Sequence, residues 1–310
     1  MRRRAVLFSL SELCCAAKVV KRLIVPRLCE ATCFLPCKCR RQRTSISCHP
    51  PKTLSIMHPL SAIALLFCLS CTQKAPDVAG SLRTATAGDS IPPPHFSLPN
   101  HDYAASRAAV KKHRQALRAA YAAERVSIDS VGKAFTQCLL TEIFPHWYGT
   151  HWTFSGHTET PGQGDIACGY FVSTTLLHTG LNLNRYRLAQ QSPADEALML
   201  SLGDTVGLTE RDTAAKALQL WRTRLRDGLY FIGLGGGHVG FLWKQSAGLY
   251  LIHSNYAGPV EVQMQRAEES VLMGFQDFYL ADITFNQRLM EYWLSGEKMP
   301  LHNRGVLVRW

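Results

Sequence analysis

The feature that most constrains the fold is a series of short apolar runs in the last third of the chain, separated by turns rich in glycine and polar residues. Runs of this length between such turns are typical of consecutive antiparallel strands. We therefore expect strands at 228–234, 238–243, 249–255, 259–264 and 278–283. Because the first three connections are too short for a crossover helix, these strands are expected to form an antiparallel sheet.

Apolar residues with helical spacing dominate the chain before these strands. An Ala-rich segment with dispersed Lys and Arg predicts a helix over 104–125, and a second helix is expected over 129–143, ended by Pro145. Residues 207–226 also form one apolar stripe, and a last helix is expected near 285–294. Helices first and strands afterwards predict the α+β fold class, with helices packed on the sheet.

The positive charge of the chain is concentrated at its N-terminus. The formal net charge is +11. Residues 1–56 contribute 12 Lys/Arg and 2 Asp/Glu, a net of +10, whereas residues 57–310 contribute 22 and 21, a net of +1. The part of the chain that is expected to fold is therefore close to neutral, and we expect no nucleic-acid partner for it.

The cysteines are divided in the same way. Of the 11 cysteines, nine precede residue 72, and Cys138 and Cys168 fall in the region expected to fold. Two cysteines do not make a disulfide framework. Cys138 lies on an apolar helix and is expected to be buried as a small hydrophobic residue.

The N-terminal third predicts an exported protein. Residues 1–56 have no sustained period and are interpreted as disordered, or as an upstream extension before a true start at Met57. The short apolar run within 57–71 suits an export signal and is too short to span a bilayer. Its ending, Leu-Ser-Cys, resembles a bacterial lipoprotein signal with Cys71 as the lipidated residue. We expect a periplasmic or cell-envelope location, with membrane attachment only through that lipid.

Two further segments complete the expected organisation. Residues 72–100 are rich in Ser, Thr, Gly and Pro and predict a flexible linker. Residues 101–310 are expected to form a single domain that begins with the two helices described above.

The candidate nucleophile is Cys168, which follows a Gly-rich loop. Asp165 at the end of that loop is a candidate N-cap, and apolar residues then recur at helical spacing as far as Gly180. Cys168 is therefore expected in the first turn of a helix, where free backbone N–H groups and the helix dipole favour a thiolate and could stabilise an oxyanion. Considered alone, the pattern favours a buried core cysteine, so a base is needed to argue for catalysis.

The candidate base is His238, which follows three glycines at 235–237 and begins a strand-like run. A four-residue turn over 244–247 would place His238 opposite His253 on the next strand. A shift of two residues would instead bring Asn255 opposite. His253 is favoured as the residue that orients His238, with Asn255 as the alternative.

Four motifs in order carry a resemblance to a known family. They are Tyr-Gly-Thr-His-Trp-Thr-Phe-Ser-Gly at 148–156, Ala-Cys-Gly-Tyr-Phe-Val at 167–172, Gly-His-Val-Gly-Phe-Leu at 237–242 and Leu-Ile-His-Ser at 251–254. Over about 135–285 the chain resembles the NlpC-type papain-like cysteine peptidases. The resemblance implies a papain-like domain with its nucleophile at a helix N-terminus.

The resemblance also implies an activity. Its nucleophile, base and orienting residue would be Cys168, His238 and His253. The family commonly cleaves amide bonds in peptidoglycan stem peptides through an acyl-enzyme, with no metal or other cofactor. Substrate contacts are expected from Tyr148, Trp152, Gly169 and Gly237.

The chain departs from the family pattern at three places. His151 replaces the usual proline, Ala-Cys-Gly-Tyr replaces Asp-Cys-Ser-Gly, and the spacing of 15 residues between base and orienting residue is longer than is typical. The first two departures lie beside the nucleophile and bear on the substrate more than on the chemistry.

Three alternatives remain open at the level of sequence. The first is a papain-fold amidase or acyltransferase that acts on another substrate. The second is a non-catalytic module that binds cell wall. The third is a metal site built from Cys168, His238 and His253, for which the sequence offers no evident fourth ligand.

Overall fold

The computed structural model describes residues 94, 96–210, 213–302 and 304–310. The chain divides into two compact units, Met1–Gly80 and Ser81–Trp310, and all described residues lie in the second. The expectations for 1–56, for the export signal with Cys71, and for most of the linker lie outside the described residues.

Helical segments occupy the first part of the described chain and recur near its end. The helices are α2 (Tyr103–Ala122), α3 (Ile128–Cys138), a π-helical turn (Leu139–Ile143), α4 (Phe144–Trp147), α5 (Cys168–His178), α6 (Arg185–Ala189), α7 (Pro193–Leu200), α8 (Ala214–Arg224), two 3₁₀ turns (Ala267–Glu269 and Val271–Gly274) and α9 (Gln287–Ser295).

The strands form one open sheet of seven strands in the order β5-β4-β3-β2-β6-β1-β7. They are β1 (Thr205–Thr209), β2 (Gly228–Leu234), β3 (His238–Gln245), β4 (Gly248–Ser254), β5 (Val262–Arg266), β6 (Phe278–Asp282) and β7 (Val306–Arg309). Neighbouring strands are antiparallel except β1 and β7, which are parallel. The α+β class is confirmed, but the sheet is mixed rather than purely antiparallel.

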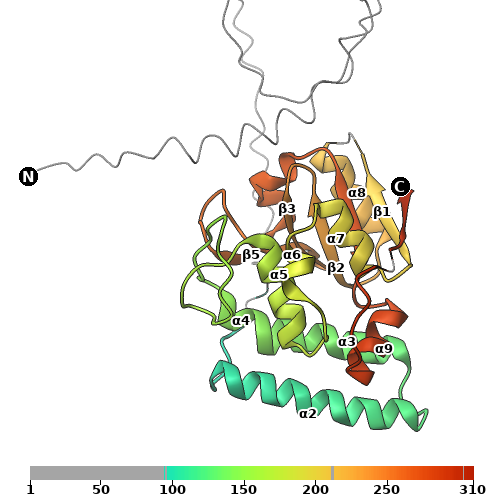
Figure 1. Ribbon diagram of the computed structural model, residues 1–310. Coiled ribbons are helices and arrows are strands. Elements are labelled where there is room, and N and C mark those ends of the chain that lie inside the picture. Colours follow the sequence, from blue (N-terminus) through green and yellow to red (C-terminus); the bar gives the residue numbers. More distant parts are fainter. Residues whose placement is uncertain (1–93, 95, 211–212, 303) are drawn as a thin grey trace, which may run out of the picture. The chain divides into compact units, whose positions relative to one another are not determined.

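Helices cover both faces of the sheet (Figure 1), and β2 shows why. Its side chains alternate between two apolar clusters: Leu229 and Phe231 belong to the cluster shared with α2, α3, α5 and α9. Tyr230, Ile232 and Leu234 belong to the second cluster, which includes residues of α8. Since successive side chains point to opposite faces, a strand that is apolar throughout requires cover on both sides.

The helix expected over 207–226 is wrong in its first part. Residues Thr205–Thr209 form β1, where Val206 pairs with Ala281 of β6 and Leu307 of β7, and α8 begins only at Ala214. These pairings join segments far apart in the chain, so the local apolar stripe could not reveal them. The short helices α6 and α7 were not predicted either.

Two smaller expectations also fail. The second helix does not end at Pro145: the chain continues through the π-helical turn into α4, where Pro145 lies in the first turn, the part of a helix that tolerates proline. The β3–β4 turn contains two residues rather than four, because Gln245 pairs with Gly248 and Lys244 with Leu249. The buried position of Cys138 is confirmed.

Candidate active site

Helix α5 brings Cys168 to the edge of a cavity. The helix starts at Cys168, with Ala167 as the N-cap and no side-chain capping bond. Asp165 is therefore not the N-cap; its carboxylate accepts a 3.0 Å hydrogen bond from His151 Nδ1. A Cβ atom on Gly169 would lie 2.5 Å from the Ala189 carbonyl oxygen, so the residue after Cys168 must be glycine for α6 to pack against α5.

Cys168 and His238 line the same cavity, which has a volume of about 720 Å³. The walls come from the loop before α5, the first turn of α5, the loop after α6 and the glycine loop before β3. The lining residues are Trp152, Phe154, Ser155, Ala167, Cys168, Gly169, Tyr170, Ala189, Gln190, Gln191, Gly236, Gly237, His238 and Tyr256. This volume is within the range of pockets that hold small molecules or short peptide segments.

The sulfur of Cys168 lies at the first residues of β3. The backbone N–H of Val239, which directly follows His238, acts on the Cys168 sulfur as a donor that lowers the pKa of the thiol. Because α5 packs across β3 and β4, the N-terminus of the helix meets the N-terminal end of β3. The fold thus brings together two residues that are 70 positions apart in the chain.

His238 is held by His253. The two side chains are buried, and His238 Nε2 lies 2.8 Å from His253 Nδ1, within hydrogen-bond distance. The register expected from the sequence is wrong, since Phe241 pairs with Ile252 and the same register extended places His238 level with Asn255. The contact with His253 is diagonal, which neighbouring strands permit. A Cβ atom on Gly240 would lie 2.8 Å from His253 Cβ, so this glycine leaves room for His253.

Asn255 does not take the orienting position. Its side-chain oxygen accepts a 3.0 Å hydrogen bond from the Ala257 backbone, which directs it into the following loop. Its neighbour Ser254 donates a 2.7 Å hydrogen bond to the Ile166 carbonyl. That bond fixes β4 to the segment just before Cys168, a role that the sequence did not indicate.

The other ring nitrogen of His238, Nδ1, is buried and has no hydrogen-bond partner among the described residues. Burial lowers the pKa of His238 to about 3, so the ring is neutral near pH 7. The pKa of His253 is also lowered, first by burial and then by the neighbouring His238. A neutral imidazole with one nitrogen held and the other unengaged, in the cavity that also holds a cysteine thiol, is a candidate general base.

The proton positions on this pair depend on Gln265. The Gln265 side-chain nitrogen lies 3.1 Å from His253 Nε2. If that amide donates, His253 donates from Nδ1 to His238 Nε2, and His238 carries its proton on Nδ1. If the amide is rotated so that its oxygen accepts from His253 Nε2–H, His238 donates from Nε2 and its Nδ1 is free to accept a proton. Only the second arrangement provides a base.

The resting form of Cys168 is the thiol. Burial raises the pKa of this half-buried residue to about 11, and the buried carboxyl group of Glu196 also raises it. The backbone N–H groups of Val239 and Gly169 lower the pKa, but by less. The thiolate expected from the helix N-terminus is therefore wrong for the resting site, because desolvation outweighs the helix dipole.

The residues expected to bind substrate are divided between two places. Trp152, Gly169 and Gly237 line the cavity of Cys168. Tyr148 instead lines a separate cavity of about 230 Å³ beside Gln263, and its hydroxyl group is buried without a hydrogen-bond partner in the described chain. Its position does not support a direct contact with a substrate at Cys168.

Of the aromatic residues that line the cavity, sequence reasoning found Trp152 but missed Phe154, Tyr170 and Tyr256. The ring of Tyr256 lies between Trp152 and His238, with centroid distances of 5.6 and 5.3 Å, and Phe154 is 89% exposed at the same cavity. Tyr170 is fixed by a 3.1 Å hydrogen bond from Gln190 and by the Arg185 guanidinium over its ring. Tyr256 directly follows the candidate orienting residues, which was the one signal available.

Within the described residues, no three His, Cys, Asp or Glu side chains are grouped in a way that could hold a metal ion. The metal alternative built on Cys168, His238 and His253 therefore has no support there, because the two histidines direct facing nitrogens at each other. In the same part of the chain, no helix has the length and apolar character needed to cross a membrane.

Comparisons with known proteins found no family model, no curated protein and no solved structure that matches this chain.

Proposed function

We propose that this protein is a cysteine hydrolase of papain-like type, in which Cys168 is the nucleophile and His238 the general base. The observation that carries the proposal is one shared cavity: the thiol lies at the start of β3, and the adjacent His238 is fixed at Nε2 and unengaged at Nδ1. A cysteine and a histidine that served only to stabilise the fold would not need to line one cavity with a ring nitrogen left unengaged.

The first half of the reaction forms an acyl-enzyme. The Cys168 sulfur attacks the carbonyl carbon of an amide while His238 Nδ1 takes the thiol proton. The carbonyl electron pair moves to oxygen, and we assign the Cys168 backbone N–H, in the first turn of α5, as a donor to that oxyanion. The C–N bond then breaks, and His238 returns the proton to the leaving amine.

The second half releases the product. Water attacks the thioester carbon, His238 Nδ1 takes a proton from that water, and the C–S bond breaks as the proton returns to sulfur. Because the resting pair is neutral, His238 must act during the attack itself rather than by keeping a preformed thiolate. His253 keeps the ring in place and is a positioning residue.

The proposed substrate class is the stem peptide of peptidoglycan. This part of the proposal rests on the resemblance of the four motifs to the NlpC-type peptidases and on the export signal at 57–71, with lipidation of Cys71 as its anchor. The aromatic wall formed by Trp152, Tyr170 and Tyr256 is suited to a peptide backbone and short aliphatic side chains.

The experiment is digestion of purified peptidoglycan by the full chain, with the products identified by mass spectrometry. We expect fragments with a new amine and a new carboxyl group, which disappear with Cys168→Ala and remain with Cys138→Ala. Identical fragments from wild type and Cys168→Ala would overturn the proposal. Addition of an amine acceptor separates hydrolysis from acyl transfer, because an acyltransferase would join the acyl group to that acceptor.

A further inference from the structure

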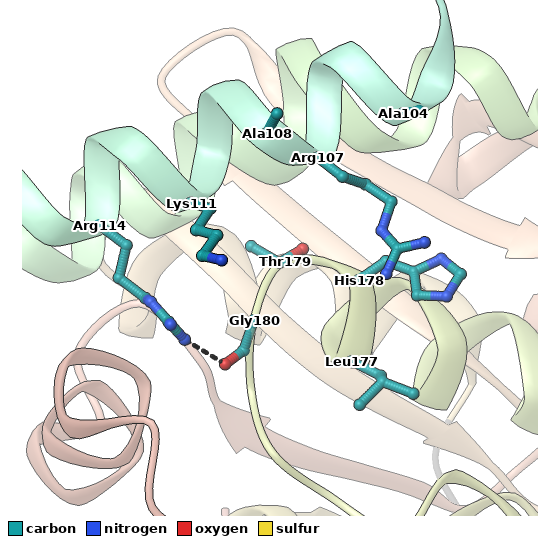
Figure 2. Close-up of a pocket in the computed structure, with 9 residues that line it drawn as sticks. All are labelled: Ala104, Arg107, Ala108, Lys111, Arg114, Leu177, His178, Thr179 and Gly180. Carbon is teal, nitrogen blue, oxygen red and sulfur yellow. Dashed lines mark hydrogen bonds between the residues drawn. The ribbon is translucent and has the colours of Figure 1, made fainter.

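A second cavity, of about 310 Å³, lies between α2 and the C-terminal end of α5. Figure 2 shows Arg107, Lys111 and Arg114 extending from one face of α2 toward this cavity, with His178 on the opposite side. Helix α2 carries five Lys or Arg residues and no Asp or Glu. The near-neutral net charge of residues 57–310 therefore conceals a local concentration of positive charge.

A structural explanation would be that these side chains cap the carbonyl end of α5. Arg114 does so, since it donates a 2.6 Å hydrogen bond to the Gly180 carbonyl (Figure 2). Four other carbonyl groups at this end accept hydrogen bonds within the fold, namely those of Thr175, Leu176, Leu177 and Thr179. Arg107 and Lys111 form no ion pair or hydrogen bond in the described part of the chain, so this explanation leaves them uncommitted.

His178 lines the same cavity and carries an N–H group without a partner in the described chain. Trp147 Nε1–H donates to the Tyr103 hydroxyl at 2.8 Å, and His178 Nδ1 lies 2.9 Å from the same oxygen. If this hydroxyl also accepted from His178, its own hydrogen would have no acceptor among the described residues, so we assign the Tyr103 O–H as the donor to His178 Nδ1. With Nδ1 as acceptor, the neutral ring carries its proton on Nε2. His178 is 6% exposed and lines the cavity, and no partner for Nε2 exists among the described residues.

The electrostatic surroundings of His178 favour a negative ligand. Arg107 and Arg185 act on the ring as positive charges, and Glu159 acts as a negative one. Glu159 is already paired with Arg185, which leaves the charge of Arg107 uncompensated. Burial and then Arg107 lower the pKa of His178 to about 4, so the ring is a neutral donor near pH 7.

From this arrangement we infer that the cavity between α2 and α5 binds a phosphate group, held by the Arg107 guanidinium, the Lys111 ammonium and the Nε2–H of His178. Donors from both sides of the cavity suit a tetrahedral anion with several acceptor oxygens better than a planar carboxylate. The phosphate could belong to a soluble ester or to a lipid headgroup, because the chemistry that recognises it is the same.

The test is isothermal titration calorimetry of the full chain with inorganic phosphate at low ionic strength. We expect Arg107→Gln combined with Lys111→Gln to weaken binding by about tenfold or more. The matched control combines Lys112→Gln with Arg118→Gln, which removes two charges from the same helix at positions that do not line the cavity. The control is expected to bind phosphate within about twofold of wild type. Circular dichroism melting of each variant verifies that it folds.

Two results would overturn the inference: no binding at millimolar phosphate, or equal loss in the cavity variant and its control, which would mean a diffuse basic surface. A second arm adds vesicles of phosphatidylglycerol or of phosphatidylcholine. Binding to the former alone, lost only in the cavity variant, assigns a lipid headgroup, and phosphate binding without vesicle binding assigns a soluble ester. As an independent readout, bound phosphate is expected to raise the pKa of His178 in an NMR titration.

Discussion

Two buried histidines in this molecule face two different cavities with opposite properties. His238 is held at Nε2 by His253 and leaves Nδ1 unengaged, in a ring that lines one cavity with Cys168. His178 is held at Nδ1 by Tyr103 and leaves Nε2–H without a partner among the described residues, in a ring that lines one cavity with Arg107 and Lys111. Burial makes both rings neutral near pH 7, so burial alone does not decide what each one can do.

The difference lies in the hydrogen-bond partner of each histidine, and in whether that partner donates or accepts a hydrogen. The Tyr103 hydroxyl accepts from Trp147 and has only His178 Nδ1 as an acceptor for its own hydrogen among the described residues, so the other nitrogen of the His178 ring is assigned as a donor. His253 can either donate or accept, depending on Gln265, so the free nitrogen of His238 can become a base. A histidine that donates to a bound anion must keep its proton on the nitrogen that faces the anion. A histidine that acts as a general base needs a nitrogen that can gain and lose a proton.

The largest effect is expected from removal of the nucleophile. Cys168→Ala should lower the hydrolysis rate by at least about 10³-fold, because the proposed mechanism forms the acyl-enzyme on the Cys168 sulfur. Cys138→Ala is the matched control, since Cys138 lies in the core, away from the cavity. Product formation measured by mass spectrometry distinguishes them, and equal loss in both variants would point to damaged folding instead.

The next effect concerns the residue that holds His238. His253→Ala should lower kcat by about 10²-fold with little change in KM, because His238 loses its fixed orientation. Asn255→Ala should cost less than about threefold, since its side chain serves the following loop. Partial recovery in His253→Asn would support a positioning role. The reverse ranking of His253 and Asn255 would contradict the site described above.

The third prediction concerns acid stability at the other histidine. The folded pKa of His178 lies below its ordinary value of 6.5, so its stabilising contribution is present above pH 6.5 and is lost as the pH falls toward 4. The change from 6.5 to about 4 corresponds to roughly 3 kcal/mol. Urea unfolding from pH 7 to pH 4 should therefore show a shallower decline in His178→Gln than in wild type. Identical slopes would refute the prediction.

The smallest effect tests the proton positions at Gln265. Gln265→Glu supplies only acceptor oxygens to His253 Nε2, which favours the arrangement with a free His238 Nδ1, and should retain or raise activity. Gln265→Leu removes the acceptor and should lower kcat by about tenfold. The carboxylate should also raise the pKa on the acidic limb of the kcat profile. Equal activity and equal profiles in both variants would exclude a role for Gln265.

The sequence predicted the fold class and the bounds of β2, because a continuous apolar run between turn residues carries a strong local signal. It did not predict β1 or β7, whose pairing joins residues about 100 positions apart. The β3–β4 register was missed because the two-residue turn, Ser-Ala at 246–247, lacks the usual Asn-Gly or Gly-containing signature.

The candidate site was predictable in part. Cys168 and His238 could be proposed as partners from their motifs, and they line one cavity. Tyr148 lines the cavity beside β5 rather than the cavity of Cys168, and Asp165 pairs with His151 instead of capping α5. The ionisation of Cys168 was also out of reach, because desolvation depends on the complete three-dimensional environment of the thiol.

The cavity at α2 was not foreseen for a related reason. The net charge of +1 over 57–310 averages a basic helix with acidic segments elsewhere. The hydrogen-bond chain that fixes the His178 proton joins Trp147 to a tyrosine 44 residues away and His178 to the same tyrosine over 75 residues. Such contacts exist only after the fold has formed.

The most direct test of the catalytic pair does not depend on the natural substrate. The full chain is mixed with p-nitrophenyl acetate, and the release of p-nitrophenolate is followed together with the position of the acetyl group by peptide mass spectrometry. The pair described above predicts acetylation at Cys168, with slower acylation in His238→Gln and none at this position in Cys168→Ala. Acetylation at Cys138 or at surface lysines, with a rate unchanged by either substitution, would contradict it.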